Sequence, residues 1–74
     1  MDHQEREWLR IGEHYARGLR IVREMAEGFT TPADAMALAA QAMELAASPY
    51  ATDTGLRALC SGMVDAAHEW LNNP

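Results

Sequence analysis

The chain has 74 residues, with 11 acidic side chains against six arginines, no lysine and a formal net charge of −5. This balance argues against sequence-independent nucleic-acid binding, which needs a basic face to displace counterions. One cysteine and three histidines supply neither a disulfide framework nor the ligands of a structural zinc site. We expect a single domain over residues 1–74, near the size at which oligomerisation commonly supplements a small core.

The N-terminal segment MDHQEREW is charged and lacks the apolar stretch of a signal peptide. No apolar run approaches the roughly 20 residues that a membrane-spanning helix needs. We therefore expect a cytoplasmic protein without a membrane partner.

The first predicted helix covers about residues 4–29, where apolar residues recur at helical spacing. Gly12 borders its apolar face, so a neighbouring helix is expected to approach closely there. The face expected to be buried comprises Trp8, Ile11, Gly12, Tyr15, Leu19, Val22, Met25, Ala26 and Phe29.

The second predicted helix, about residues 32–48, is apolar nearly all round. Thr31 is the expected N-cap, followed by Pro32 in the first turn and the Asp34 carboxylate at the third position. Most of the remaining surface is Ala, Leu or Met, about twice the apolar arc that a surface helix of a small domain needs. Two sides carry large residues, Met36 and Met43 on one and Leu38 and Leu45 on the other. Whichever side packs inward, the other is left for a partner.

The third predicted helix covers about residues 54–71, and Thr52 or Asp53 can cap its start. Cys60 lies in the middle of its apolar face, where a small buried side chain with an unactivated thiol is expected. Asp65 and His68 are three residues apart on the polar face, a spacing that can present two ligands to one metal ion.

Short connections predict an all-α, up-down-up three-helix bundle with a long first helix, which we expect to dimerise. The first helix, about 25 residues or roughly 37 Å, is longer than the other two, so its first two turns should overhang them. Trp8 in this overhang is either an interface anchor or a ring packed on the Pro49–Tyr50 loop. The residues expected to form the partner or dimer interface are Trp8, Leu9, Ile11, Met36, Ala40, Met43 and Ala47.

These features favour a small, acidic, non-enzymatic protein–protein interaction module without a cofactor. Regulatory proteins, adaptors and inhibitors, including phage inhibitors, antitoxins and immunity proteins, share this physical profile. The expected partner is another protein, with a second copy of the chain also expected to bind. The alternative is a metal- or ligand-binding helical bundle assembled as a dimer, using Asp65 and His68.

Overall fold

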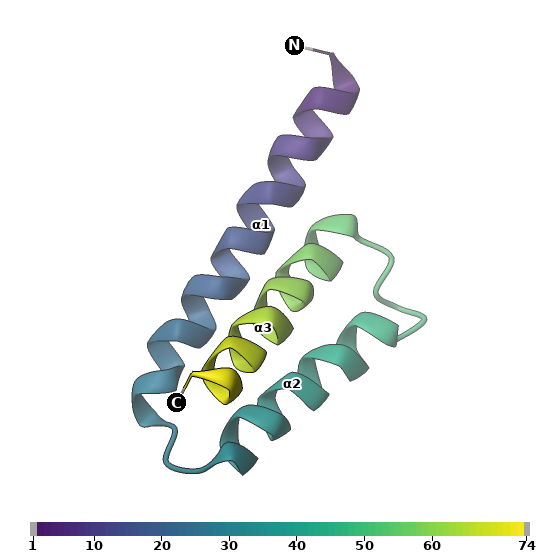
Figure 1. Cartoon of the computed structure of the whole chain (residues 1–74). Helices are drawn as coiled ribbons and strands as arrows, with labels where there is room; N and C mark the ends of the chain where they lie inside the picture. Colours follow the sequence, from purple (N-terminus) through teal and green to yellow (C-terminus); the bar gives the residue numbers. More distant parts are fainter. Residues whose placement is uncertain (1, 74) are drawn as a thin grey trace.

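The computed structural model describes residues 2–73. Along this part of the chain, α1 covers His3–Met25, the short 3₁₀ helix η1 Ala26–Gly28, α2 Pro32–Ala47 and α3 Thr54–Asn72 (Figure 1). The expected all-α fold of three packed helices is confirmed.

Each helix begins at a polar residue that satisfies free backbone N–H groups. The Asp2 side chain accepts a hydrogen bond from the Glu5 N–H at 2.8 Å, and Asp53 accepts one from the Gly55 N–H at 3.2 Å. At the start of α2 the Asp34 carboxylate accepts a hydrogen bond from the N–H of the N-cap residue Thr31 at 3.0 Å. These bonds pair donors that the first turn of a helix leaves without partners.

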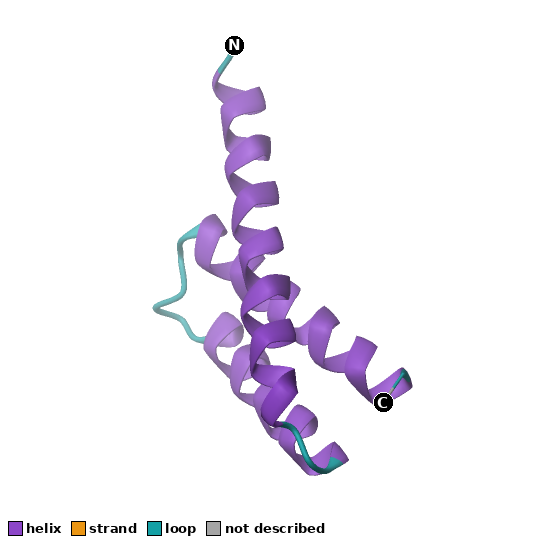
Figure 2. Cartoon of the chain, turned by 90° about the vertical axis from the view of Figure 1, so that its left-hand side faces the viewer, coloured by secondary structure: helices purple, strands orange, loops and turns teal. Residues whose placement is uncertain are grey.

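The central helix is α3, which packs against α1 on one side and α2 on the other (Figure 1). The chain runs along α1, returns along α2 and then follows α3 in the direction of α1. Although α1 and α2 are consecutive, they barely touch, and Figure 2 shows α1 continuing past the other two helices. The molecule is accordingly thin, with extents of 44 × 25 × 16 Å.

The core is built mainly from alanine. Of the buried hydrophobic residues, seven are alanines, and the largest fully buried side chains are Val22 and Cys60. Larger residues surround this core near the η1 end, where Phe29 and Trp70 meet edge to face with ring centroids 5.4 Å apart. Small side chains allow short distances between helix axes, but each one removes little apolar surface from water.

The backbones of α1 and α3 approach each other closely at Gly18 and Gly62. A Cβ atom on Gly18 would lie 2.1 Å from the Leu59 carbonyl oxygen, and one on Gly62 would lie 2.2 Å from the Tyr15 carbonyl oxygen. The two backbones are therefore in direct contact, and only glycine fits at either position.

The predicted buried face of the first helix is wrong in part. Gly12 is exposed and a Cβ there would meet no atom within 4 Å, so the close approach expected at Gly12 occurs at Gly18. Trp8 and Met25 are exposed as well. The cause is that α1 turns its Gly18 side to α3 in order to bring the backbones together, which leaves Trp8 and Gly12 off the contact.

Candidate partner-binding surfaces

The N-terminal end of α1 projects beyond α3, as the difference in helix length predicts (Figure 1). The two helices are joined where α3 begins. Arg10 donates to the Asp53 carboxylate at 2.6 Å and to the Thr54 hydroxyl at 3.2 Å, and the Thr54 hydroxyl donates to Glu7 at 2.5 Å. The Arg10 guanidinium is the main cause that lowers the pKa of Asp53. This polar cluster fixes the direction in which the end of α1 leaves the bundle.

On the same turn of α1, between Glu7 and Arg10, Trp8 and Leu9 have exposed fractions of 65% and 53%. Tyr50, in the loop where Trp8 could have packed, is 91% exposed. Because both rings are largely exposed, Trp8 does not pack on the Pro49–Tyr50 loop to close the end of the bundle. Ile11, which was also expected in the exposed interface, is instead half-buried.

The second candidate surface lies on α2. Its packed strip consists of small residues, Ala35, Ala39 and Ala42. The Met side and the Leu side of α2 flank this strip. On the Leu side, Leu38 is half-buried and packs against the core, whereas Leu45 is exposed. Met36 and Met43 are 60% and 56% exposed. Ala40 and Ala47, on the same side as the two methionines, are exposed too.

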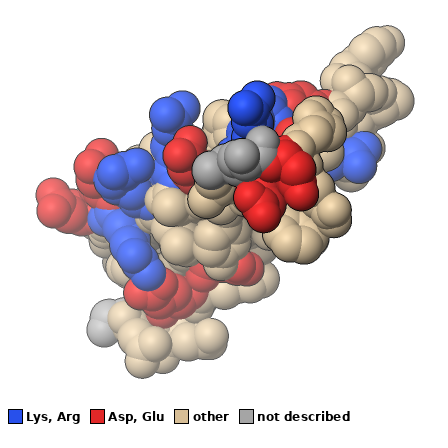
Figure 3. All heavy atoms as spheres, turned by 90° about the horizontal axis from the view of Figure 1, so that it is seen from above, with Lys and Arg blue, Asp and Glu red and all other residues tan. Residues whose placement is uncertain are grey.

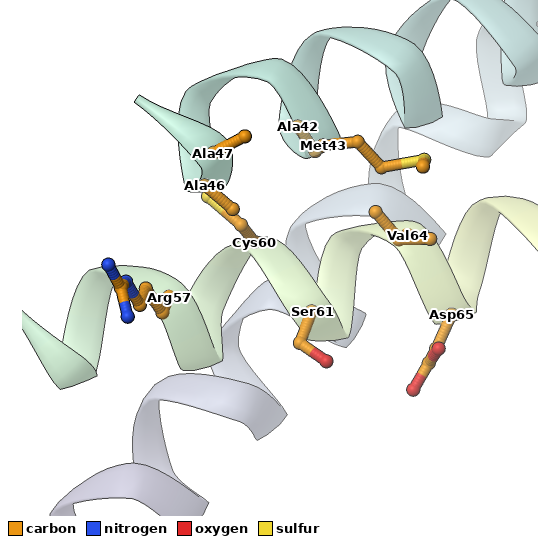
Figure 4. Close-up of a pocket in the computed structure, with 9 residues that line it drawn as sticks. All are labelled: Ala42, Met43, Ala46, Ala47, Arg57, Cys60, Ser61, Val64 and Asp65. Carbon is orange, nitrogen blue, oxygen red and sulfur yellow. The ribbon is translucent and has the colours of Figure 1, made fainter. Parts of the chain in front are cut away.

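An open groove with a volume of about 400 Å³ runs between this side of α2 and the neighbouring face of α3 (Figure 4). Met43 and Val64 form parts of its two walls. Arg57 and Asp65 lie along α3 at its border, and Cys60 lies between the helices. The groove is mostly apolar with charged groups at its margin, which is the composition of a protein interface.

The Cys60 thiol is only 1% exposed. The groove passes over it without giving solvent access to the sulfur. A buried thiol among apolar neighbours packs as a small hydrophobic group and is shielded from reagents.

Polar side chains elsewhere on the molecule bridge helices. The Tyr15 hydroxyl donates to Asp65 at 2.5 Å, which raises the pKa of Tyr15, and Arg23 donates to Glu69 at 3.0 Å. Figure 3 shows basic and acidic groups interspersed on the viewed face rather than gathered into patches of one sign. The Tyr15–Asp65 and Arg23–Glu69 pairs each join α1 to α3.

The two candidate metal ligands do not gain a third. Asp65 is hydrogen-bonded to Tyr15, and His68 is exposed. Within residues 2–73, no group of three or more His, Cys, Asp or Glu side chains is arranged to hold a metal ion.

The structure adds two features that sequence reasoning missed. One is the glycine contact between α1 and α3, for which the signal was the recurrence of small residues on α3 at Ala58, Gly62 and Ala66. The other is the contribution of α3 to the α2 surface through Val64 and Ser61. Both features arise from contacts of α3 with another helix, and the sequence does not show which helices are in contact.

Comparison of the chain with protein-family models, with curated proteins and with solved structures gives no match. Over the residues described, no helix combines the length and the apolar character that crossing a membrane requires.

Proposed function

We propose that this chain is a non-enzymatic protein–protein interaction module of the regulatory, adaptor or inhibitor type. The observation that carries the proposal is that the buried apolar side chains are small and many of the large apolar side chains are exposed. Alanines fill the core, whereas seven large apolar residues within residues 2–73 are exposed. The exposed large residues are Trp8, Leu9, Met25, Met36, Met43, Leu45 and Tyr50. Exposed apolar side chains that gather at the end of one helix and along the side of another favour a binding role.

The polar groups support a non-enzymatic role. Nucleophilic catalysis needs an accessible nucleophile next to a base, whereas the Cys60 sulfur is buried. The clusters formed by Arg10 with Asp53 and by Tyr15 with Asp65 each join α1 to α3. Their arrangement is accounted for by helix packing.

Trp8 is the proposed anchor for a protein partner. An aromatic side chain buries about 150–250 Å² when covered, so the 65% of Trp8 that is exposed offers roughly 3–4 kcal/mol of hydrophobic gain. The charged neighbours Arg6, Glu7 and Arg10 surround this ring in sequence. An aromatic centre with a polar border is typical of an interface hot spot.

The test is capture of binding proteins from the native cell or host, with the whole chain as bait, followed by a direct affinity measurement on the purified partner. Trp8→Ala should weaken that affinity by about 30-fold or more, equivalent to about 2 kcal/mol. Its thermal midpoint should stay close to that of the wild type, because the ring is mostly exposed. Tyr50→Ala is the matched control, since it removes another exposed aromatic ring outside the proposed surfaces.

Three results would count against the proposal. One is a loss of roughly 3 kcal/mol of stability in Trp8→Ala, which would make the ring a core residue. Another is a bound protein whose affinity responds equally to both aromatic substitutions. A purified chain that turns over a substrate would contradict the non-enzymatic part.

A further inference from the structure

The open side of α2 carries a regular alternation of large and small residues. We call Met36, Ala40, Met43 and Ala47 the Met side; at about 100° per residue these positions fall within an arc of about 60°. All four are exposed. Along the chain the order is large, small, large, small.

This order is complementary to its own reverse. If a second α2 lies antiparallel across the first, with the two helices centred between Gln41 and Ala42, Met36 meets Ala47 of the second copy. Ala40 then meets Met43 of the second copy, and the two remaining contacts follow by symmetry. Each methionine faces an alanine, which is how two helix surfaces interdigitate without voids or clashes.

We propose that the Met side and the adjoining groove bind a second copy of this chain, forming a two-fold symmetric dimer in which the two α2 helices are antiparallel. A two-fold interface must be self-complementary, because the same surface contributes from both copies. The alternation on α2 meets that requirement. The inference rests on the proposed function, because it names one partner of the interaction module.

Charge also favours this face for contact between two identical acidic chains. Each copy has a formal net charge of −5, so two copies repel unless the contact surface excludes acidic groups. The Met side has no charged residue among its four positions. On α3, Val64 points toward Met43 of α2, whereas Ser61 and the charged Asp65 point away from α2.

The size of this face suits a dimer of moderate affinity. α2 has 16 residues, which is about 24 Å of helix, and two helices side by side are roughly 20 Å wide. That outline is about 480 Å², close to the roughly 500 Å² per partner at which a specific interface begins. The total surface of one chain is 5194 Å², so the dimer would cover a modest share of it. We expect a dissociation constant in the micromolar range.

The experiment is sedimentation equilibrium on the purified full chain from about 1 to about 200 µM, a range chosen to span micromolar affinity. The wild type should move from 8.2 kDa to twice that mass. Ala40→Glu should remain monomeric, because two buried carboxylates would face apolar side chains. Ala37→Glu is the matched control: Ala37 is exposed on another side of α2, so this variant should dimerise like the wild type.

A size exchange between the two central positions tests the register. Ala40→Met alone places methionine against methionine, and Met43→Ala alone leaves alanine against alanine. Each should weaken the dimer by about tenfold or more. The double variant restores one large and one small residue at each contact and should recover most of the lost affinity.

A wild-type chain that stays at 8.2 kDa throughout this range would overturn the inference. So would a dimer that Ala40→Glu does not weaken, or a double variant no better than the single variants, provided that circular dichroism shows each variant folded. This failure is distinguishable from failure of the proposed function, because a monomeric chain that binds another protein through Trp8 still satisfies the latter.

Discussion

Replacing Gly18 with alanine tests whether the α1–α3 contact is the central feature of this fold. The added methyl carbon would lie 2.1 Å from the Leu59 carbonyl oxygen and 3.0 Å from the Met63 nitrogen. Even a close carbon–oxygen contact needs about 3.3 Å. The two helices must therefore separate by about 1 Å, and the obstacle is backbone that cannot rotate away.

The expected magnitude combines two opposing effects. Overpacking of this kind costs about 1–3 kcal/mol, and a backbone obstacle places it at the upper end. Alanine in place of glycine recovers about 1 kcal/mol of helix propensity. The net loss for Gly18→Ala is about 2 kcal/mol, or roughly 8–16 °C in thermal midpoint for a domain of this size.

Gly12→Ala is the matched control on the same helix. A Cβ on Gly12 meets nothing within 4 Å, so only the propensity gain remains and the midpoint should rise by roughly 4–8 °C. Both variants are compared with the wild type by thermal unfolding at one protein concentration, because self-association raises the midpoint of any dimer. A Gly18→Ala variant as stable as the wild type would refute the reasoning, and so would equal losses in the two variants.

Two further predictions concern the stability of the fold at acid pH and the reactivity of the Cys60 thiol. The backbone N–H of Thr30 lowers the pKa of Asp34, and Arg10 lowers that of Asp53, from the ordinary 3.8. Because the folded state favours both charged forms, their stabilisation is present above about pH 4 and is lost as the pH falls further. Urea unfolding from about pH 5 to about pH 2.5 should show a smaller fall in stability for Asp34→Asn and Asp53→Asn than for the wild type, and parallel curves would contradict this. Cys60 should react with a thiol reagent only as fast as the protein opens, and Cys60→Ala should cost about 1 kcal/mol without loss of partner binding; rapid labelling of the folded chain would show that the sulfur is accessible.

The helices themselves could be predicted because their signals are local. Thr31, Pro32 and Asp34 mark the start of α2 within four residues, and the structure places the Asp34 carboxylate on the Thr30 and Thr31 N–H groups. The overhang of α1 also followed from the sequence, since it depends only on helix lengths. Trp8 and Leu9 are exposed at the base of this overhang, on a turn whose Glu7 and Arg10 side chains contact Thr54 and Asp53.

The faces of the helices could not be predicted in the same way. Seven-residue spacing placed Trp8 and Val22 on one face of α1, but a straight helix drifts about 20° per heptad. The contact was then decided by Gly18 and Gly62, which are distant in sequence and carry no side chain to contribute to a hydrophobic pattern. Likewise, the sequence did not indicate which helix would be central, whereas small residues on two sides of α3 let it pack against both α1 and α2.

The same cause explains the buried alanines and the exposed large residues. Close helix contacts at Gly18 and along Ala35, Ala39 and Ala42 leave no space for large side chains between the helices, so Met36 and Met43 point away from the packed strip. A core this small contributes limited hydrophobic stabilisation. Covering the Met side would add part of what the monomer lacks, so the stability of the fold and its association should be coupled.

That coupling gives a prediction that separates self-association from binding at the end of α1. If the Met side is covered in a dimer, the thermal midpoint of the wild type should rise with protein concentration, because association stabilises the folded state by mass action. Ala40→Glu should remove this dependence, whereas Trp8→Ala should retain it, because Trp8 lies on the projecting end of a different helix. The measurement is a series of thermal unfolding curves over about a hundredfold range of protein concentration. A midpoint that is independent of concentration in the wild type would contradict the α2 dimer and the coupling of stability to association.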